Sequence, residues 1–312
     1  MNMRVVVVAL SAVVAVVSGG ASVVQQPGTG QPGRENAGDK SNRIDLRPKF
    51  KVGQSVRFKM TMKSDSGEEG GQSMEQEIVL KMTTRSGDVE KGSTVEMLYE
   101  SLKFKLNAGD MDVSFDSTKP DKNNPYDSIL RPLVGLKMNV VFDTDGNITS
   151  VSGDESGGGL SGMVAGQFSG ADVARGVFGP IAGTRKGDGH AAVGESWTNE
   201  DVISGGLGST QVKTTNTLES VKGGRANISI KGSVLLDGSG STGLPMVNIK
   251  DSTLKGKAVW DVEAGMLESM TQEQTLSIEA PSLEMDPDAK PTKGDRPTLT
   301  KHTMKVSVNR LK

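Results

Sequence analysis

The residues whose types and spacing best suit metal binding lie between Asp143 and Asp154. Asp143, Asp145 and Asn147 would supply oxygen atoms at the first, third and fifth positions of a helix–loop–helix calcium site. The sixth position, which that site needs as glycine, is Ile148, and the last is an aspartate in place of the longer glutamate. Strand-like alternation flanks the segment, so we predict a hairpin turn rather than a metal site.

A catalytic role would have to come from acidic residues in two similar turns. These residues are Asp143, Asp145, Asp261 and Glu263. Carboxylates act as general acid and base only when they lie within hydrogen-bond reach of the reacting group, and the sequence offers no reason except similarity to bring the two turns together. The histidines, His190 and His302, have no partner motif nearby. We therefore predict no catalytic residue and no enzyme activity.

The segment Gly238–Gly243, GSGSTG, has the glycine spacing of a dinucleotide-binding loop. That loop must follow a strand and begin a helix. Here Leu244–Val247 follows and is typical of a strand, so we predict a hairpin loop and no cofactor.

The N-terminus predicts export. Arg4 precedes the apolar run Val5–Val17, and small residues follow up to Ala21, which is the layout of a cleavable signal peptide over residues 1–21. An uncleaved membrane anchor is the alternative, but the run is shorter than the roughly 20 residues that a span needs. Residues 22–43 are rich in Gly, Pro and Gln and predict a disordered linker.

The amino-acid composition limits where the protein is expected to be located and which partners it is expected to bind. The chain has no cysteine, which excludes a lipid-modified N-terminus and disulfides. We expect a secreted or periplasmic, soluble, non-lipidated protein without a stable membrane span after cleavage. The formal net charge is −2 with both signs mixed, which argues against a nucleic-acid partner.

Alternation of apolar and polar residues predicts strands through most of the chain. A break in the alternation near Ser101 predicts a bulge, and Arg85–Asp88 is expected to be a turn. The predicted strands are Ser55–Met62, Glu77–Met82, Thr94–Leu106, Met138–Phe142, Gln211–Leu218, Ala226–Leu236, Met246–Leu254, Gly256–Val262, Met266–Glu279 and Leu299–Leu311. The proline-rich segment Pro281–Pro297 is expected to be an irregular loop.

Two segments have helical spacing. Apolar residues recur at intervals of three to four in the short stretch after Asn124 and again over Leu160–Ile181. Four glycines weaken the second segment, so we expect one broken helix or two short ones, held by packing on the sheet.

The sequence contains a faint internal repeat. Val52–Val56 matches Val193–Trp197, and Val141–Ser150 matches Val259–Ser269, in the same order. We predict a first β-module over residues 44–154, a helical connector over 155–189 and a second β-module over 190–312. The predicted fold class is mainly β (α+β): a curved antiparallel sheet of two similar modules, with the broken helix packed on it.

These motifs also carry a resemblance. The signal, the linker, the VG[QE]S strand starts, LVGLKMNVVFDTDGNITSVSG and WDVEAGMLES resemble a family of uncharacterised secreted bacterial proteins. The pattern is similar as well to the curved half-barrel sheets of periplasmic lipoprotein-carrier proteins. The resemblance implies a fold and a compartment but no activity.

Two functional hypotheses remain besides an enzyme. The first is an exported, non-catalytic protein that binds a lipid or other apolar ligand, in a cavity lined by adaptable methionines. These methionines are Met60, Met62, Met82, Met97, Met138 and Met270. The alternative for them is that they fill a core poor in aromatic residues. The second hypothesis is a structural or protein-interaction component of the cell envelope.

Overall fold

The computed structural model describes somewhat less than two-thirds of the chain. The predicted signal peptide, residues 22–42 of the predicted linker, the predicted helix Leu160–Ile181, the GSGSTG segment and the loop Pro281–Pro297 lie outside the described residues. The described residues are 43–67, 71–88, 92–108, 111–121, 123–144, 146, 148–153, 189–205, 208–237, 248–280 and 298–312.

Most of the described residues form β-strands. A two-stranded ribbon pairs β1 (Ile44–Asp45) with β8 (His190–Ala191). The strands of the large sheet are β2 (Ser55–Asp65), β3 (Gln72–Asp88), β4 (Gly92–Ala108), β5 (Met111–Asp116), β6 (Lys137–Phe142), β7 (Ile148–Gly153), β9 (Ser196–Gly205), β10 (Gly208–Lys222), β11 (Arg225–Asp237), β12 (Asn248–Asp261), β13 (Met266–Ala280) and β14 (Thr298–Leu311). The helices are α2 (Asp127–Leu130) and the 3-10 turn η3 (Arg131–Leu133).

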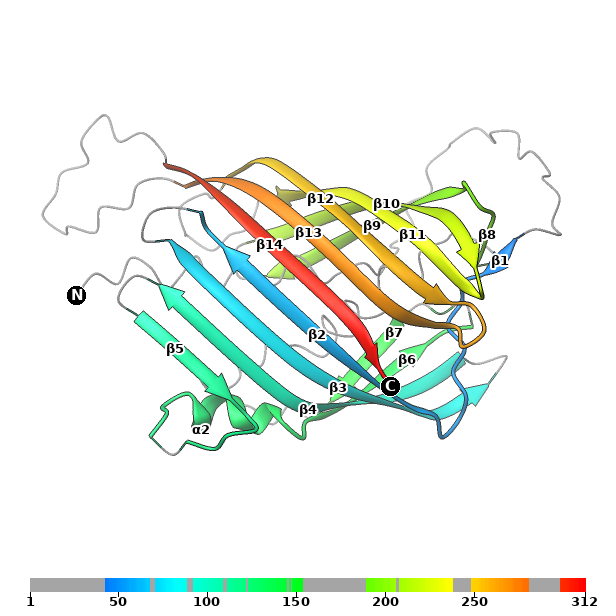
Figure 1. Ribbon diagram of the computed structural model, residues 1–312, viewed down its shortest axis with the longest axis horizontal. Helices are drawn as coiled ribbons and strands as arrows, with labels where there is room; N and C mark the ends of the chain where they lie inside the picture. The colour runs from blue at the N-terminus through cyan, green and yellow to red at the C-terminus, as the bar shows by residue number, and fades with distance from the viewer. Residues whose placement is uncertain are drawn as a thin grey trace, which may run out of the picture.

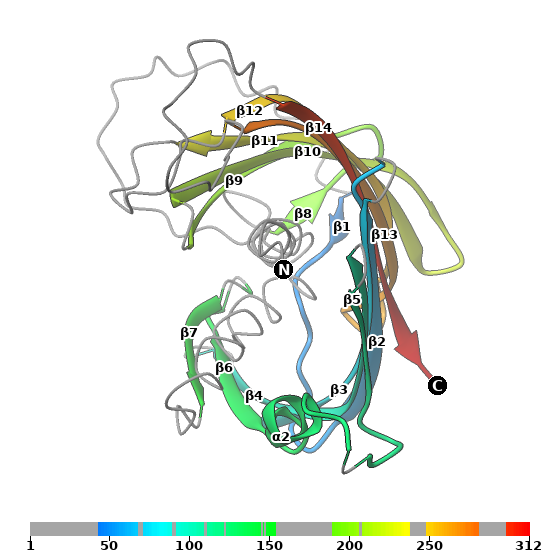
Figure 2. The same ribbon diagram turned by 90° about the vertical axis from the view of Figure 1, so that its left-hand side faces the viewer.

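The large sheet has twelve antiparallel strands in the order β7-β6-β4-β3-β2-β14-β13-β12-β11-β10-β9, with β5 added beside β4. Neighbouring strands are mostly consecutive in the sequence, except where β2 pairs with β14 in the middle of the sheet. The described strands do not close the sheet: β7 and β9 are the ends of the strand order, and β5 forms a further short edge beside β4. Figure 1 shows the strands crossing the molecule, and Figure 2 shows the sheet bent into an open curve.

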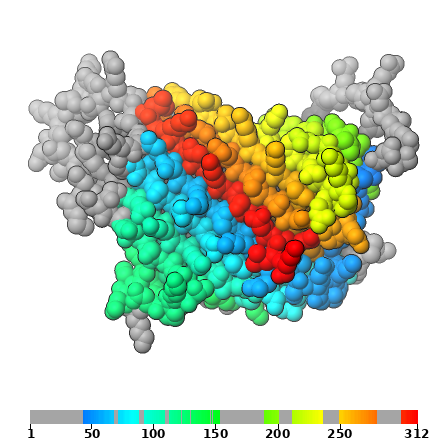
Figure 3. Space-filling model, viewed as in Figure 1, coloured from blue at the N-terminus to red at the C-terminus, as the bar shows by residue number. Residues whose placement is uncertain are grey.

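The two faces of the sheet differ in chemistry. Alternate residues of β2 and its neighbours are buried on the inner, concave face, where Phe58, Met60 and Met62 belong to one apolar core. The residues between them are charged or polar and form cross-strand ion pairs on the outer face, such as Lys59–Glu77 at 2.6 Å. Figure 3 shows this outer face, with β14 running across its centre. The strand periodicity therefore positions an apolar surface inside the curve.

The predicted mainly β, antiparallel class is confirmed, and so is the predicted bulge near Ser101. The pairing of β3 with β4 skips Glu100, between Tyr99 and Ser101. The helical spacing after Asn124 is confirmed only as the short elements α2 and η3. No described helix packs along the sheet as the predicted broken helix would. Among the described residues, no helix combines the length and apolarity that a membrane crossing requires.

Two local predictions are wrong. The predicted turn Arg85–Asp88 belongs to β3, because the pairing skips Arg85 and the resulting bulge interrupts the alternation without ending the strand. The strands predicted over Met246–Leu254 and Gly256–Val262 are one strand, β12. Gly256 lies inside β12, where a Cβ atom would come within 2.7 Å of the Thr271 carbonyl oxygen. Glycine there marks close backbone approach rather than a strand end. The strand β5 was not predicted.

The two VG[QE]S segments make the same hydrogen bonds. In each, the glycine amide donates to a carbonyl on the next strand, whose amide donates back to the residue after the glycine. The pairs are Gly53–Thr84 and Thr84–Gln54 in the first segment, and Gly194–Leu218 and Leu218–Glu195 in the second. The second repeated motif also matches, since the pairing of β6 with β7 skips Thr149 and that of β12 with β13 skips Glu268.

Candidate functional site

The acidic residues singled out from the sequence lie at hairpin turns. The turn between β6 and β7 contains Gly146, and the turn between β12 and β13 contains Gly265, both with positive φ (87° and 60°). Asp145 and Asn147 lie outside the described residues. In the part of the chain that the structure describes, no three acidic or histidine side chains are grouped to hold a metal ion.

The Asp261 carboxylate is engaged in building its own turn. Its Oδ1 accepts a hydrogen bond from the Ala264 amide at 3.0 Å, and its Oδ2 pairs with Arg310 on β14 at 2.7 Å. The backbone hydrogen bond and then the guanidinium hold the pKa of Asp261 below its ordinary value. Such a carboxylate is a fixed anion that ties the turn to the last strand.

The segment Arg43–Phe50, which we call the strap, brings both turns to one place. It begins as β1 beside β8 and runs along the inner side of the sheet (Figure 2). The Lys49 amide donates to the Gly265 carbonyl at 3.0 Å, and its Nζ donates to the Val262 carbonyl at 2.9 Å. Pro48 lies against Gly146, and the Phe50 ring lies 4.6 Å from the Phe142 ring. The strap thus contacts the β6–β7 turn near one edge of the sheet and the β12–β13 turn in its other half.

The histidines lie in different elements. His190 is in β8, where its carbonyl oxygen accepts a hydrogen bond from Arg43 at 2.8 Å. His302 is on β14, opposite Leu276 of β13. His190 therefore lies beside the first residues of the strap, and His302 lies among the long central strands.

The methionines singled out from the sequence are all buried on the inner face. Register places three of them side by side, because Met97 on β4 pairs with Met82 on β3 and with Met138 on β6. Their exposed fractions are 6% for Met60, 4% for Met62, 5% for Met82, 0% for Met97, 4% for Met138 and 1% for Met270. Met74 and Met304 extend the same surface.

Polar residues interrupt this apolar face, and they were not predicted from the sequence. One straight row of paired positions crosses the sheet through Gln76, Met62, Val306, Gln272, Gly256, Ile230, Asn216 and Trp197. The next row contains Gln274 opposite Met304, and then Thr214 opposite Asn199. The sequence pattern could have revealed these polar residues, because they occupy inward positions that are otherwise apolar in alternating strands.

Three buried glutamines have side-chain atoms without a hydrogen-bond partner among the described residues. Gln274 is 1% exposed, and neither its Nε2 nor its Oε1 makes a hydrogen bond to a described residue. Gln272 Oε1 and Gln76 Nε2 are in the same condition, each on a side chain 7% exposed. Buried side-chain amides are normally satisfied, so this group requires an explanation.

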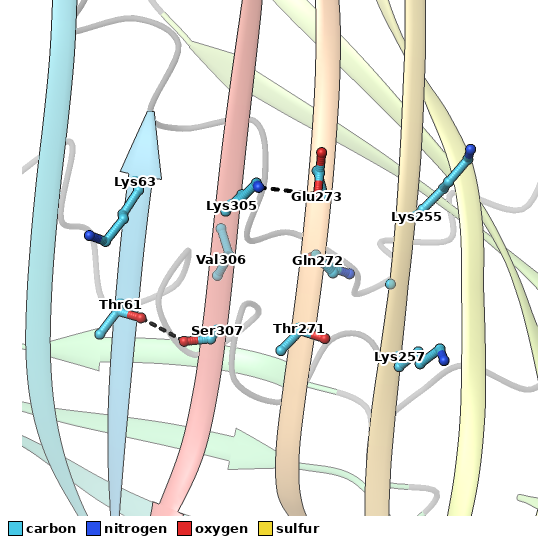
Figure 4. A pocket seen from close by; sticks show the side chains of 11 residues that line it. Thr61, Lys63, Lys255, Lys257, Thr271, Gln272, Glu273, Lys305, Val306 and Ser307 are labelled. Atoms are coloured by element: carbon cyan, nitrogen blue, oxygen red, sulfur yellow. Dashed lines mark hydrogen bonds and ion pairs between the residues drawn. The ribbon is translucent and has the colours of Figure 1, made fainter. Parts of the chain in front are cut away.

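The outer face carries a basic groove of about 520 Å³ across β2, β14, β13 and β12 (Figure 4). Its lining side chains include Lys63, Lys255, Lys257 and Lys305. Glu273 lies 3.6 Å from Lys305, and the Thr61 and Ser307 hydroxyls are hydrogen-bonded at 2.6 Å. Glu75 pairs with Lys63 at 2.7 Å, so two carboxylates accompany the four ammonium groups. The groove keeps an excess of positive charge, which suits an anionic group.

The family comparison finds the chain in two stretches, residues 90–156 and 188–267. The chain matches a family of unknown function, DUF6263. The first stretch extends from the end of the β3–β4 connection past β7, and the second extends from just before β8 into β13. The predicted resemblance to a family of unknown function is therefore confirmed. No curated protein matches the sequence.

Solved structures show a related fold. A structure describing lipid–protein interactions in lipovitellin superposes with a TM-score of 0.50 at 10% identity, covering 85% of this chain. The match covers 26% of the lipovitellin chain, so this protein corresponds to about a quarter of that one. DynF, from the dynemicin biosynthesis pathway of Micromonospora chersina, matches at a TM-score of 0.22 and 7% identity, over 90% of this chain and 92% of its own. A score that low does not indicate a shared fold.

Proposed function

We propose that the protein is a non-catalytic, exported protein that binds a lipid or similarly apolar ligand on the inner face of its sheet. The observation that carries this proposal is the concave face itself, which combines buried methionines with glutamine amides that have no hydrogen-bond partner among the described residues. Ligand sites in proteins are mostly apolar and concave, with few polar groups. Methionine side chains adapt to ligands of different shape because they are unbranched and flexible.

The lipovitellin comparison supports the same proposal. The structure that shares this fold describes lipid–protein interactions in lipovitellin. Fold likeness at 10% identity does not transfer a ligand, so the support is that such a curved antiparallel sheet is compatible with lipid contact. The partner that we propose is therefore an apolar small molecule or lipid, with no cofactor involved.

We further propose that the sheet consists of two copies of one β-module, over residues 44–154 and 190–312. The shared hydrogen bonds of the VG[QE]S segments and the shared skipped positions, Thr149 and Glu268, support this division. Duplication explains how one continuous inner face came to be wide enough for an extended ligand.

The test is the binding of an apolar fluorescent dye and of lipids from the protein's own host. We expect dye uptake by the full chain, displacement of the dye by lipid, and an unfolding temperature that rises with lipid concentration, as it does for any ligand that binds the folded state. Protein purified from its host should carry lipid in native mass spectrometry. Absence of both dye uptake and co-purified lipid would overturn the proposal.

Two variants localise the binding. Met62→Gln places a polar group on the inner face and is expected to weaken dye binding about tenfold. Lys63→Gln, one residue further along β2, changes the outer face and is expected to leave dye binding unchanged. Circular dichroism of both variants without ligand checks that the sheet is intact. Equal weakening by both variants would place the dye elsewhere.

The basic groove favours a second candidate function, contact with an anionic lipid surface of the cell envelope. Lys255 and Lys257 lie on β12 and are separated from Lys305 on β14 by the strand β13. Exposed charges of this kind act mainly through salt-screened attraction. Sedimentation with vesicles tests it: binding should need phosphatidylglycerol in addition to phosphatidylcholine and should fall in about 0.5 M salt. The double variant Lys255→Gln/Lys257→Gln should lose this binding, whereas Lys119→Gln should keep it. Equal binding to neutral vesicles would contradict this role.

A further inference from the structure

The buried glutamines of β13 lie at the centre of the inner face. Gln272 and Gln274 are successive inward residues of one strand, so their side chains start about 7 Å apart. Gln272 has Val306 of β14 on one side and Gly256 of β12 on the other. Gln274 has Met304 and Leu254 in the corresponding positions. Both amides are thus surrounded by apolar side chains or bare backbone.

Glycine leaves the backbone uncovered beside these amides. A Cβ atom at Gly256 would lie 2.8 Å from Cγ of Gln272, so the glutamine side chain leans over the glycine. Gly232, which pairs with Leu254 on the adjoining strand, would place a Cβ atom 2.3 Å from the Lys213 carbonyl oxygen. The strands approach closely here, and the amide groups remain within the concave surface.

A protein that held only hydrocarbon would gain nothing from these groups. A buried amide without a partner opposes folding, whereas an apolar residue of similar volume would not. Gln274 has two unpaired polar atoms, a donor and an acceptor, and Gln272 adds an acceptor. A ligand that both accepts and donates hydrogen bonds would satisfy the set.

The buried polar residues also decide the charge of that ligand. Among the described residues, those that are buried and polar are all uncharged: Ser66, Gln76, Thr84, Asn199, Thr214, Asn216, Gln272 and Gln274. A carboxylate or phosphate placed among them would be buried without a compensating cation, which is strongly unfavourable. Ester, amide and hydroxyl groups carry no such cost.

We propose that Gln272 and Gln274 form a recognition site for the uncharged polar group of an otherwise apolar ligand, such as the ester and hydroxyl groups of an acylglycerol. This inference rests on the proposed function, because it names the ligand class of the same inner face. Anionic lipids, if they bind at this face, must keep their charged groups outside it.

The test compares ligands of equal chain length in competition with the apolar dye, using the full chain. The ligands are a diacylglycerol, its saturated hydrocarbon counterpart and the free fatty acid. We expect the wild-type protein to prefer the diacylglycerol over the hydrocarbon by about tenfold, the effect of a net hydrogen bond or two. The free fatty acid should be the poorest competitor at pH 8, where it is ionised.

Gln274→Leu removes the donor and the acceptor at similar volume. It should abolish the preference for diacylglycerol, retain dye binding, and leave the unfolding temperature without ligand equal or higher, because an unpaired buried amide is lost. Thr275→Ala, at the next residue of β13 and on the outward phase of that strand, should preserve the preference.

Three outcomes are distinguishable. Absence of dye binding by the wild-type protein would overturn the proposed function itself. Dye binding with no preference among the ligands, or with a preference that Gln274→Leu leaves intact, would overturn the recognition site alone. A marked fall in the unfolding temperature of ligand-free Gln274→Leu would mean that the amide has a structural partner, and would also overturn it.

Discussion

At the scale of single residues, Gly146 and Gly265 show how two turns depend on the absence of a side chain. Both have positive φ, and a Cβ atom would lie 2.3 Å from Cδ of Pro48 at the first and 2.7 Å from the Lys49 amide nitrogen at the second. Backbone conformation and close contact with the strap therefore both require glycine.

We predict that Gly146→Ala lowers the free energy of unfolding by about 2–4 kcal/mol, from left-handed strain and the displaced strap together. Gly135→Ala is the matched control, since Gly135 has φ of 90° but no atom within 4 Å of the added Cβ. It should cost only about 1 kcal/mol, the strain alone. Urea unfolding of both variants measures the difference, and equal losses would contradict a contact with the strap.

Asp261 makes the protein sensitive to acid. Its pKa in the folded state lies below the ordinary value because of the Ala264 amide and Arg310, so its stabilisation is fully present above the unfolded-state pKa of about 3.9. That stabilisation is lost as the pH falls through the lower pKa of the folded state.

Asp261→Asn should therefore lower the unfolding midpoint at pH 7 while reducing the further loss between pH 5 and pH 2. The amide oxygen can still accept the Ala264 hydrogen bond, but the charge opposite Arg310 is gone. Denaturant midpoints measured across this pH range test the change. Asp251→Asn, on the exposed side of β12, serves as the control and should leave the acid dependence as in the wild-type protein.

At the scale of elements, the strap is the feature that alternation could not reveal. It has two residues in a strand, yet it contacts β8 and the turns that end β6 and β12. Leu46, 4% exposed, anchors its first half, and the Phe50–Phe142 contact anchors its end.

We predict that Leu46→Ala costs about 2–4 kcal/mol, the usual range for a truncated buried leucine, and loosens that end of the sheet. Hydrogen exchange should accelerate in the β6–β7 and β12–β13 turns ahead of the central strands. Val52→Ala, at a side chain 63% exposed, should change neither quantity. Unchanged exchange at the turns in Leu46→Ala would show that the strap does not brace them.

The sequence predicted the strands well because one face is buried and the other is charged, which imposes a period of two. It failed where that period is disturbed without a change of element, at the bulged Arg85 and at Gly256 in β12. The short strand β5, only six residues long, carries too little pattern to be recognised.

The candidate site was predicted in part. The methionines were expected from the sequence either to line a cavity or to fill the core, and the structure buries all six on the apolar phase of their strands. Gln272 and Gln274 share that phase too, but their importance depends on burial and missing partners, which only the folded sheet shows. The convergence of the two acidic turns on adjacent strap residues, Pro48 and Lys49, likewise depends on strand order.

At the scale of the whole molecule, strand order makes one curved sheet out of two sequence halves. Strands β2 to β7 form one half of the sheet and strands β9 to β14 form the other half. The two halves meet where β2, from the start of the first half, pairs with β14, from the end of the second. This order makes the inner face continuous across β2 and β14, and places Gln272 and Gln76 in one row.

The pairing of β2 with β14 has a consequence for how the chain folds. The hydrogen-bonded Thr61 and Ser307 are 246 residues apart in the chain, whereas most other neighbours in the sheet are joined by short connections. Hairpins between consecutive strands can form early, but the entropy lost in closing a long loop delays distant pairs. We expect the two half-sheets to form first and their joining to limit the folding rate. During synthesis, one edge of β2 must then remain unpaired until β14 has been made.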